Sequence, residues 1–207
     1  AGPVGRVFIA GASGPLGRAA VQAYVDRGHD VVAFVRPSSR HTFPSAVERR
    51  TGDVTNRQSL AQDGLRGECF DAVVSCLASR TGAPRDAWAI DHAATVALIQ
   101  AAKTAEAGQF ILLSALCVQK PKLAFQEAKL AAEAELKESG LTYSIVRPTA
   151  FFKSLSGQIA RVQKGGAFTV FGDGELTRCK PISDRDMGHY LVDCLEQVKL
   201  HNQVLPI

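Results

Sequence analysis

Residues 9–18 read IAGASGPLGR, and the three glycines in this stretch, Gly11, Gly14 and Gly17, stand three positions apart. An apolar run at residues 7–9 precedes them and a helix-like segment follows. A strand, a glycine turn and a helix in this order aim backbone N–H groups and the positive end of a helix dipole at a phosphate. Glycine also permits the tight turn and the close packing of the helix on its strand. The stretch predicts a dinucleotide site, although glycine spacing alone is also compatible with a plain turn.

The predicted phosphate-binding residues are Gly11, Ala12, Ser13, Gly14, Pro15, Leu16 and Gly17. Proline suits the first turn of a helix, where its missing N–H would have had no partner in any case. Pro15 therefore supports a helix that begins at this point of the chain.

Apolar runs and helix-like segments alternate along the rest of the chain. Strands are expected at residues 6–10, 30–35, 46–50, 70–78, 109–114 and 141–147, and helices at 15–27, 56–65, 87–106, 123–139 and 184–198. This alternation, without an internal repeat or a low-complexity linker, predicts an α/β protein: a doubly wound parallel sheet, the Rossmann fold, with helices on both faces. The expected strand order is 3-2-1-4-5-6. We expect one domain over residues 1–207.

The residue after the second strand bears on the choice of nucleotide. An acidic residue there binds the ribose 2′-hydroxyl of NAD, whereas arginine accommodates the 2′-phosphate of NADP. Arg36 follows the strand directly and Arg40 lies close behind, with no Asp or Glu between them. The charge argument favours NADPH, and the alternative is a pair of solvated arginines in a loop.

Other predicted cofactor contacts follow from the sheet topology. Asp53 and Val54 come after the third strand, where an adenine ring can rest, but Asp53 is equally suited to a local turn or cap. The segment Leu77, Ala78 and Ser79 ends the fourth strand and is expected to line the crevice beside the first strand.

Composition excludes several classes of function. The net charge of +4 is scattered, without a Lys/Arg cluster interleaved with aromatic residues, so no nucleic-acid partner is predicted. No apolar run is long enough for a transmembrane segment. Five cysteines without C-x-x-C spacing, four of them in apolar surroundings, are expected to be buried free thiols. The five histidines show no ligand pairing, so no metal site is predicted.

Ser114 at the end of the fifth strand and Lys129 on the following helix complete a pattern that resembles the short-chain dehydrogenase/reductase superfamily, in its atypical branch. Usual members carry Tyr-x-x-x-Lys on that helix, and four residues of helix place both side chains on one face. This chain has Phe125 at the tyrosine position. Because a phenyl ring cannot donate a proton, carbonyl–alcohol chemistry by that route is excluded.

Several longer sequence segments resemble those of one family, the divinyl chlorophyllide 8-vinyl reductases. Members of this family also carry phenylalanine in place of the tyrosine. These segments are CLASR at 76–80, DAW at 86–88, LLSALCVQKP at 112–121, FQEAKL at 125–130, YSIVRPTAFFKS at 143–154, FGDG at 171–174, CKPIS at 179–183 and VLPI at 204–207. The resemblance implies NADPH-dependent reduction of the 8-vinyl group of a divinyl chlorophyllide, a tetrapyrrole, to ethyl in the chloroplast. It implies that Lys129 positions the nicotinamide ribose, and Ser114 is either an orienting hydroxyl or only the last residue of its strand.

The segment Pro148, Thr149, Ala150 and Phe151 follows the sixth strand, where its backbone is expected to meet the nicotinamide carboxamide. Lys120, Cys117 and Tyr143 are alternative candidates for the proton donor, each with an equal structural interpretation.

Family members usually continue beyond the VLPI segment, so we expect the substrate-enclosing region to be short or absent in this chain. The chain opens AGP shortly before the first strand, and we expect a processed form without its transit peptide. Two further interpretations remain open at this point. One is a catalytically idle paralogue that serves as a structural subunit of a larger photosynthetic or organellar complex; the weaker one is an NADPH-sensing regulator.

Overall fold

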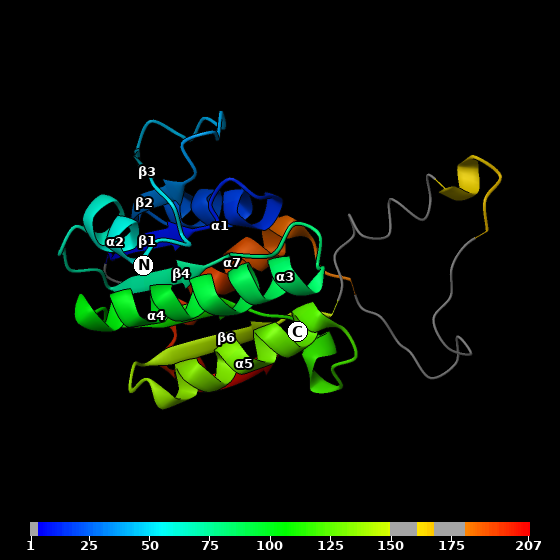
Figure 1. The fold of residues 1–207 in the computed structure, drawn as a ribbon. Helices are drawn as coiled ribbons and strands as arrows, with labels where there is room; N and C mark the ends of the chain where they lie inside the picture. The colour runs from blue at the N-terminus through cyan, green and yellow to red at the C-terminus, as the bar shows by residue number, and fades with distance from the viewer. Residues whose placement is uncertain (1–3, 150–160, 168–180) are drawn as a thin grey trace.

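A computed structural model describes residues 4–149, 161–167 and 181–207 of the chain (Figure 1). Its centre is a seven-stranded sheet in the order β3-β2-β1-β4-β5-β6-β7, and every neighbouring pair of these described strands is parallel. The strands are β1 (Arg6–Ala10), β2 (Asp30–Val35), β3 (Val47–Thr51), β4 (Ala72–Ser75), β5 (Phe110–Leu113), β6 (Tyr143–Arg147) and β7 (Gln203–Pro206). The doubly wound parallel sheet predicted from the alternation is confirmed, with the expected order for its first six strands.

The seventh strand is an addition that the sequence pattern did not predict. β7 pairs with β6 in parallel register, from Ser144 opposite Gln203 to Arg147 opposite Pro206. It is short and contains a proline, which lacks an N–H and is tolerated at the edge of a sheet. Its position is fixed at its end, where Ile207 N donates to Arg147 O (3.1 Å) and Thr149 N donates to Ile207 O (3.0 Å).

One face of the sheet is covered by α1 (Pro15–Asp26) and α7 (Asp184–Glu196), which pack on each other behind the sheet in Figure 1. Alternate strand residues such as Val7, Ile9 and Val74 point into this layer. The two helices approach closely at Gly188, because this residue has no Cβ. A Cβ there would lie only 2.5 Å from the carbonyl oxygen of Ala19. The fully buried Tyr24 hydroxyl donates to Leu191 O (2.7 Å) and joins the pair.

The other face carries the remaining long helices. They are α2 (Arg57–Ser59) continuing into η1 (Leu60–Leu65), α3 (Pro84–Ala87) continuing through η2 (Trp88–Ala94) into α4 (Thr95–Thr104), and α5 (Ala124–Glu138). Strand residues of opposite parity, among them Phe8, Phe34 and Phe110, form the core beneath them. The short turns η3 (Leu116–Gln119) and η4 (Val198–Leu200) complete the described elements. Helices on both faces are therefore confirmed, and the described helices are too short or too polar to span a bilayer.

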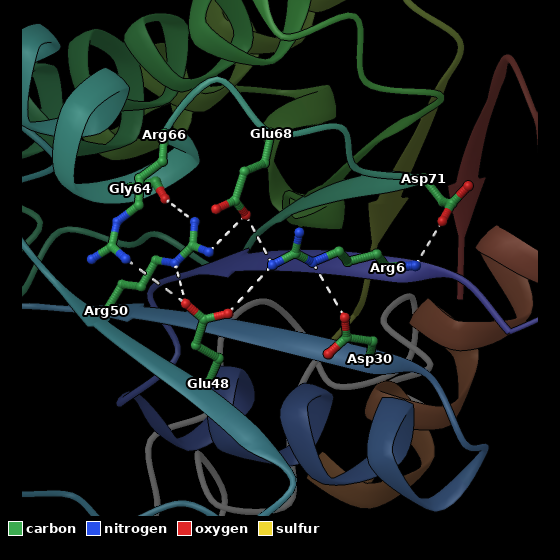
Figure 2. Close-up of polar contacts among 8 residues, drawn as sticks. All are labelled: Arg6, Asp30, Glu48, Arg50, Gly64, Arg66, Glu68 and Asp71. Atoms are coloured by element: carbon green, nitrogen blue, oxygen red, sulfur yellow. Dashed lines mark hydrogen bonds and ion pairs between the residues drawn. The ribbon is translucent and has the colours of Figure 1, made fainter.

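An ion-pair cluster joins the first three strands to the segment before β4 (Figure 2). The Arg50 guanidinium, 2% exposed, donates to Glu48 Oε1 (2.8 Å), Gly64 O (2.6 Å) and Glu68 Oε2 (2.7 Å). Arg6 pairs with Asp30 (3.2 Å) and also reaches Glu48 and Glu68. These contacts tie β3, an edge strand of the described sheet, to β1 and to the chain that leads into β4.

Candidate functional site

The glycine stretch forms a tight loop between β1 and α1. Gly11 has φ +72°, and a Cβ there would lie 2.6 Å from the carbonyl oxygen of Cys76 at the end of β4. A Cβ on Gly17 would overlap the carbonyl oxygen of Gly11. The loop is held between two neighbours, β4 and the first turn of α1, that leave no room for side chains at these two positions.

Gly14 lies at the start of α1 and faces open space. Its φ of −71° is available to any residue, and the nearest atom to an added Cβ is Gly11 O at 3.6 Å. The first N–H groups of a helix have no partner within the helix. Here no side chain caps them, the first turn contains no acidic residue, and Pro15 occupies the first position. This helix terminus is suited to an anion such as a phosphate.

A cavity of ≈ 720 Å³ opens in front of this terminus, at the carboxyl ends of β1, β2 and β4. Its lining residues are Gly11, Ser13, Gly14, Pro15, Leu16, Gly17, Phe34, Val35, Arg36, Val54, Cys76, Leu77, Ala78, Arg80, Thr81, Asp86 and Ile90. Ten of them are residues predicted from the sequence to contact a nucleotide. The volume lies within the range of small-molecule and cofactor sites, about 300–1,000 Å³.

Several predicted contacts lie outside the lining of this cavity. They are Ala12, which is fully buried, together with Arg40, Asp53, Ser79, Ser114, Lys129, Pro148 and Thr149. Asp53 accepts hydrogen bonds from the backbone N–H (2.8 Å) and the hydroxyl (2.7 Å) of Thr55, and these bonds lower its pKa. Its carboxylate therefore acts in a local turn, one of the two roles the sequence allowed. Ala150 and Phe151 lie outside the described residues.

The backbone after β6 is already engaged in hydrogen bonds. Thr149 N donates to Ile207 O (3.0 Å), and Pro148 O accepts from Leu116 N (3.0 Å). Thr149 belongs to the segment whose backbone was expected to meet the nicotinamide carboxamide, and its N–H is bonded to Ile207, which follows β7.

The loop after β4 supplies cavity residues that sequence reasoning missed. Thr81 donates through its backbone N–H (2.8 Å) and its hydroxyl (2.9 Å) to Asp86 Oδ2, and the backbone bond is the main reason that the pKa of Asp86 is lowered. Arg80 and Thr81 come directly after the predicted contacts Leu77, Ala78 and Ser79, and Asp86 follows in the first turn of α3 (Pro84–Ala87). Continuing the predicted crevice segment by a few residues would have found them.

The mouth of the cavity near β2 carries positive charge. Arg36 begins the loop that follows β2 and is exposed. The Arg49 guanidinium, from β3, donates to the carbonyl oxygens of Ser39 and His41 (3.2 Å for the latter). Arg49 thereby anchors the loop that contains both Arg36 and Arg40, a contact that no local pattern in the sequence indicates.

Lys129 on α5 forms a buried ion pair with Asp91 in η2. Its Nζ lies 3.0 Å from Asp91 Oδ1, and the two side chains are 14% and 1% exposed. The same Asp91 oxygen accepts a hydrogen bond from Ser79 N (3.3 Å). Phe125, one turn before Lys129, faces the same loop, because a Cβ on Gly82 would lie 3.6 Å from its ring. Asp91 was not predicted, although it is an isolated acid in an apolar segment.

Other polar groups near these strand ends are buried without partners. The hydroxyls of Ser114 and Ser75 have no hydrogen-bond partner among the described residues. Burial raises the pKa of the Cys76 thiol to about 12, against the opposing positive charge of Lys129, so the thiol stays protonated at neutral pH.

Two expectations from the sequence are wrong. Tyr143 is the first residue of β6 and pairs with Phe110, the first residue of β5, so it lies at the amino edge of a sheet whose cavity is at the carboxyl edge. It is therefore excluded as a proton donor at this site. Of the four described cysteines, all free, Cys69 and Cys117 are exposed rather than buried.

The described residues contain no group of three or more His, Cys, Asp or Glu side chains arranged to hold a metal ion.

A family profile described as NAD(P)H-binding matches residues 11–198. The chain belongs to this NAD(P)H-binding family. Its glycine loop, open helix terminus and cavity fit a nicotinamide dinucleotide, which is the ligand class of the family.

Among individual proteins, this member of the NAD(P)H-binding family is 45% identical to the chloroplastic divinyl chlorophyllide a 8-vinyl-reductase of Cucumis sativus, over 97% of this chain and 52% of that protein. It is 30% identical to the photosystem II assembly factor Ycf39 of Cyanophora paradoxa, over 97% of this chain and 62% of that protein. The chain thus spans about half the length of the curated reductases it matches.

Among solved structures, the Bordetella bronchiseptica enzyme WbmH in complex with NAD+ superposes with a TM-score of 0.76 at 19% identity, covering 95% of this chain and 74% of that one. At this identity the likeness shows a shared fold, and it agrees with the Rossmann architecture described above.

Proposed function

We propose that this chain is the NADPH-binding part of a reductase that converts the 8-vinyl group of a divinyl chlorophyllide into an ethyl group. The observation that carries the cofactor assignment is the cavity in front of α1, with a helix terminus free of caps at its floor and Arg36 at its mouth. The substrate assignment is supported by the 45% identity to a protein named for that reaction.

The proposed cofactor contacts follow the cavity and extend past its lining at both ends. The diphosphate binds at residues 11–17, where the N–H groups of the first turn of α1 donate to it. Arg36 and Arg40 bind the 2′-phosphate, because no carboxylate stands between them to repel it. The adenine lies near Val54, which lines the cavity, and near Asp53 outside the lining. The nicotinamide half lies along Leu77 and Ala78 of the lining and beyond them toward Ser79, Ser114 and Lys129.

NADPH bound in this site supplies a hydride. The conjugated macrocycle spreads the resulting negative charge, and a proton must then reach the carbon skeleton. Phe125 cannot provide that proton, and its ring gives an apolar surface beside the loop after β4. Lys129 contributes a fixed positive charge and an N–H donor for the nicotinamide ribose, while the Ser114 hydroxyl is available to orient a polar group.

The reductase is favoured over the idle structural subunit by degree of similarity. Identity is 45% to the Cucumis reductase and 30% to the assembly factor Ycf39, over the same share of this chain. The name of the Cucumis protein also supports a chloroplast location, and we propose the stroma or the stromal face of the thylakoid, where NADPH and the pigment substrate meet.

Two measurements test the proposal separately. Titration of the purified chain with NADPH, followed by nicotinamide fluorescence, is expected to saturate at micromolar concentration, with weaker binding of NADH. The protein expressed from its complete coding sequence is then supplied with divinyl chlorophyllide and NADPH. Mass spectrometry should detect a product heavier by two hydrogens. Binding without product would contradict the substrate assignment, and absence of saturable binding would contradict the cofactor assignment.

A further inference from the structure

Asp91 is an acidic side chain in a place that ordinarily excludes one. It lies in η2 between Ile90 and His92, and its side chain is 1% exposed. Burial of a carboxylate is costly unless a positive charge or hydrogen-bond donors compensate for it. Asp91 makes no contribution to the hydrophobic core, and it does not line the cavity. The polar contacts of Asp91 therefore have to explain why an acidic residue stands at this position.

The contacts of Asp91 join two separate segments of the site. Its Oδ1 is 3.0 Å from Lys129 Nζ on α5 and accepts a hydrogen bond from Ser79 N (3.3 Å) in the loop after β4. One carboxylate oxygen therefore fixes both the ammonium group and the segment of chain next to Leu77 and Ala78, which line the cavity. Lys129 has a long side chain with several rotamers, and an ion pair at its tip restricts them.

The second carboxylate oxygen is also informative. Asp91 Oδ2 is buried and has no hydrogen-bond partner among the described residues. A buried acceptor without a donor is unfavourable. The contacts of Oδ1 with Lys129 and Ser79 are therefore the reason for a carboxylate at this position.

We propose that Asp91 is a positioning residue for the nicotinamide half of the cofactor. It holds Lys129 and the backbone of Ser79 in fixed relative positions, so that the ammonium group meets the ribose in one geometry. The inference rests on the proposed NADPH site and adds to it a residue that acts through Lys129. The adenosine half of the cofactor, at Arg36, is independent of it.

The experiment compares two ligands on one variant. Asp91→Asn preserves the shape of the side chain and removes its charge. Binding of NADPH and of 2′,5′-ADP, which contains only the adenosine half, is measured by calorimetry on wild type and variant. We expect NADPH to bind about tenfold more weakly to the variant, as for loss of one charge-assisted contact, with 2′,5′-ADP affinity unchanged.

Glu133→Gln serves as the matched control. Glu133 lies one turn after Lys129 on the same helix, is 0% exposed, and pairs with Arg147 (2.8 and 2.6 Å). It also loses a buried ion pair on α5, but one without a contact to Lys129 or Ser79. We expect its melting temperature to fall while the ratio of NADPH to 2′,5′-ADP affinity stays at the wild-type value.

A second pair of variants covers the case in which Asp91→Asn alone does not fold. The double variant Asp91→Asn/Lys129→Met removes both charges, so neither partner is left buried and unpaired. It is expected to bind NADPH as weakly as Lys129→Met, because Asp91 acts through Lys129. A further loss in the double variant, or an equal loss of both ligands in Asp91→Asn, would overturn the inference. Wild-type protein that binds 2′,5′-ADP and NADPH with one affinity would overturn it too. Wild-type protein that binds neither would instead remove the proposed function itself.

Discussion

The first turn of α1 is packed directly against the carbonyl oxygen of Gly11, so that a Cβ on Gly17 would overlap that oxygen and lie 2.8 Å from the Cα of Ala12. Gly14, the middle glycine of the same triplet, has no neighbour closer than 3.6 Å to its missing Cβ. Glycines that look equivalent in the sequence therefore have different roles. Gly17 is required for the packing of the loop, and Gly14 leaves space at the floor of the cavity.

Replacement of these two glycines separates folding from binding. Gly14→Ala is expected to melt within about 2 °C of wild type, because its φ of −71° suits alanine, yet to bind NADPH at least tenfold more weakly. Gly17→Ala is expected to lose about 1–3 kcal/mol of stability by overpacking. Thermal melts and fluorescence titration measure the two effects. Unchanged NADPH affinity in Gly14→Ala would show that the diphosphate does not approach this glycine.

Removal of the Arg36 guanidinium tests the choice of nucleotide. Arg36→Ala is expected to weaken NADPH binding about 10- to 100-fold, the equivalent of one charge-assisted phosphate contact, while NADH binding changes little. Arg57→Ala, an exposed arginine outside this cavity, is the control and should leave both affinities unchanged. Equal losses for NADPH and NADH would place the 2′-phosphate elsewhere.

The buried Arg50 guanidinium offers a test of the cluster in Figure 2. Arg50→Met removes its bonds to Glu48, Gly64 and Glu68 but keeps most of the apolar stem. Because both carboxylates stay partly hydrated, we expect a loss of about 2 kcal/mol, or roughly 4–8 °C in melting temperature. A melting temperature equal to that of wild type would mean that the cluster contributes nothing to the attachment of β3.

The same cluster predicts a pH dependence. Hydrogen bonds from Arg50 are the main cause that lowers the pKa of Glu48 and of Glu68, so both carboxyls bind protons more weakly in the folded chain than in the unfolded one. Their contribution to stability is present above the unfolded pKa of about 4.3 and is lost as the pH falls through the lower folded values. Urea midpoints of wild type and Arg50→Met should differ clearly at pH 7 and converge in acid. A constant difference would contradict the assignment.

Thiol reactivity is expected to divide the described cysteines into two pairs. Cys69 and Cys117 are exposed and should be alkylated rapidly at about pH 7.5. Burial raises the pKa of Cys76 and of Cys194 to about 12, so these two should react slowly. Peptide mapping after timed exposure to iodoacetamide distinguishes them. Rapid labelling of Cys194 in the native protein would show that the layer between α1 and α7 opens.

The amino-acid sequence alone determined the local features of this protein. The glycine triplet, the apolar runs and the alternation of strand with helix each depend on residues that are close together in the chain, so the tight glycine loop and the order of six strands were predictable. The place of Arg36 in the lining of the cavity was predictable in the same way, because Arg36 directly follows β2.

The tertiary structure alone decided the contacts between distant segments. Asp91 meets Lys129 across 38 positions of sequence, Arg49 reaches back to the loop after β2, and β7 acquires its place only by pairing with β6. Exposure of Cys69 and Cys117 likewise depends on which helices cover the sheet. The physical reason is that local propensity acts over a few residues, whereas burial and charge pairing are set by whichever side chains the completed fold brings together.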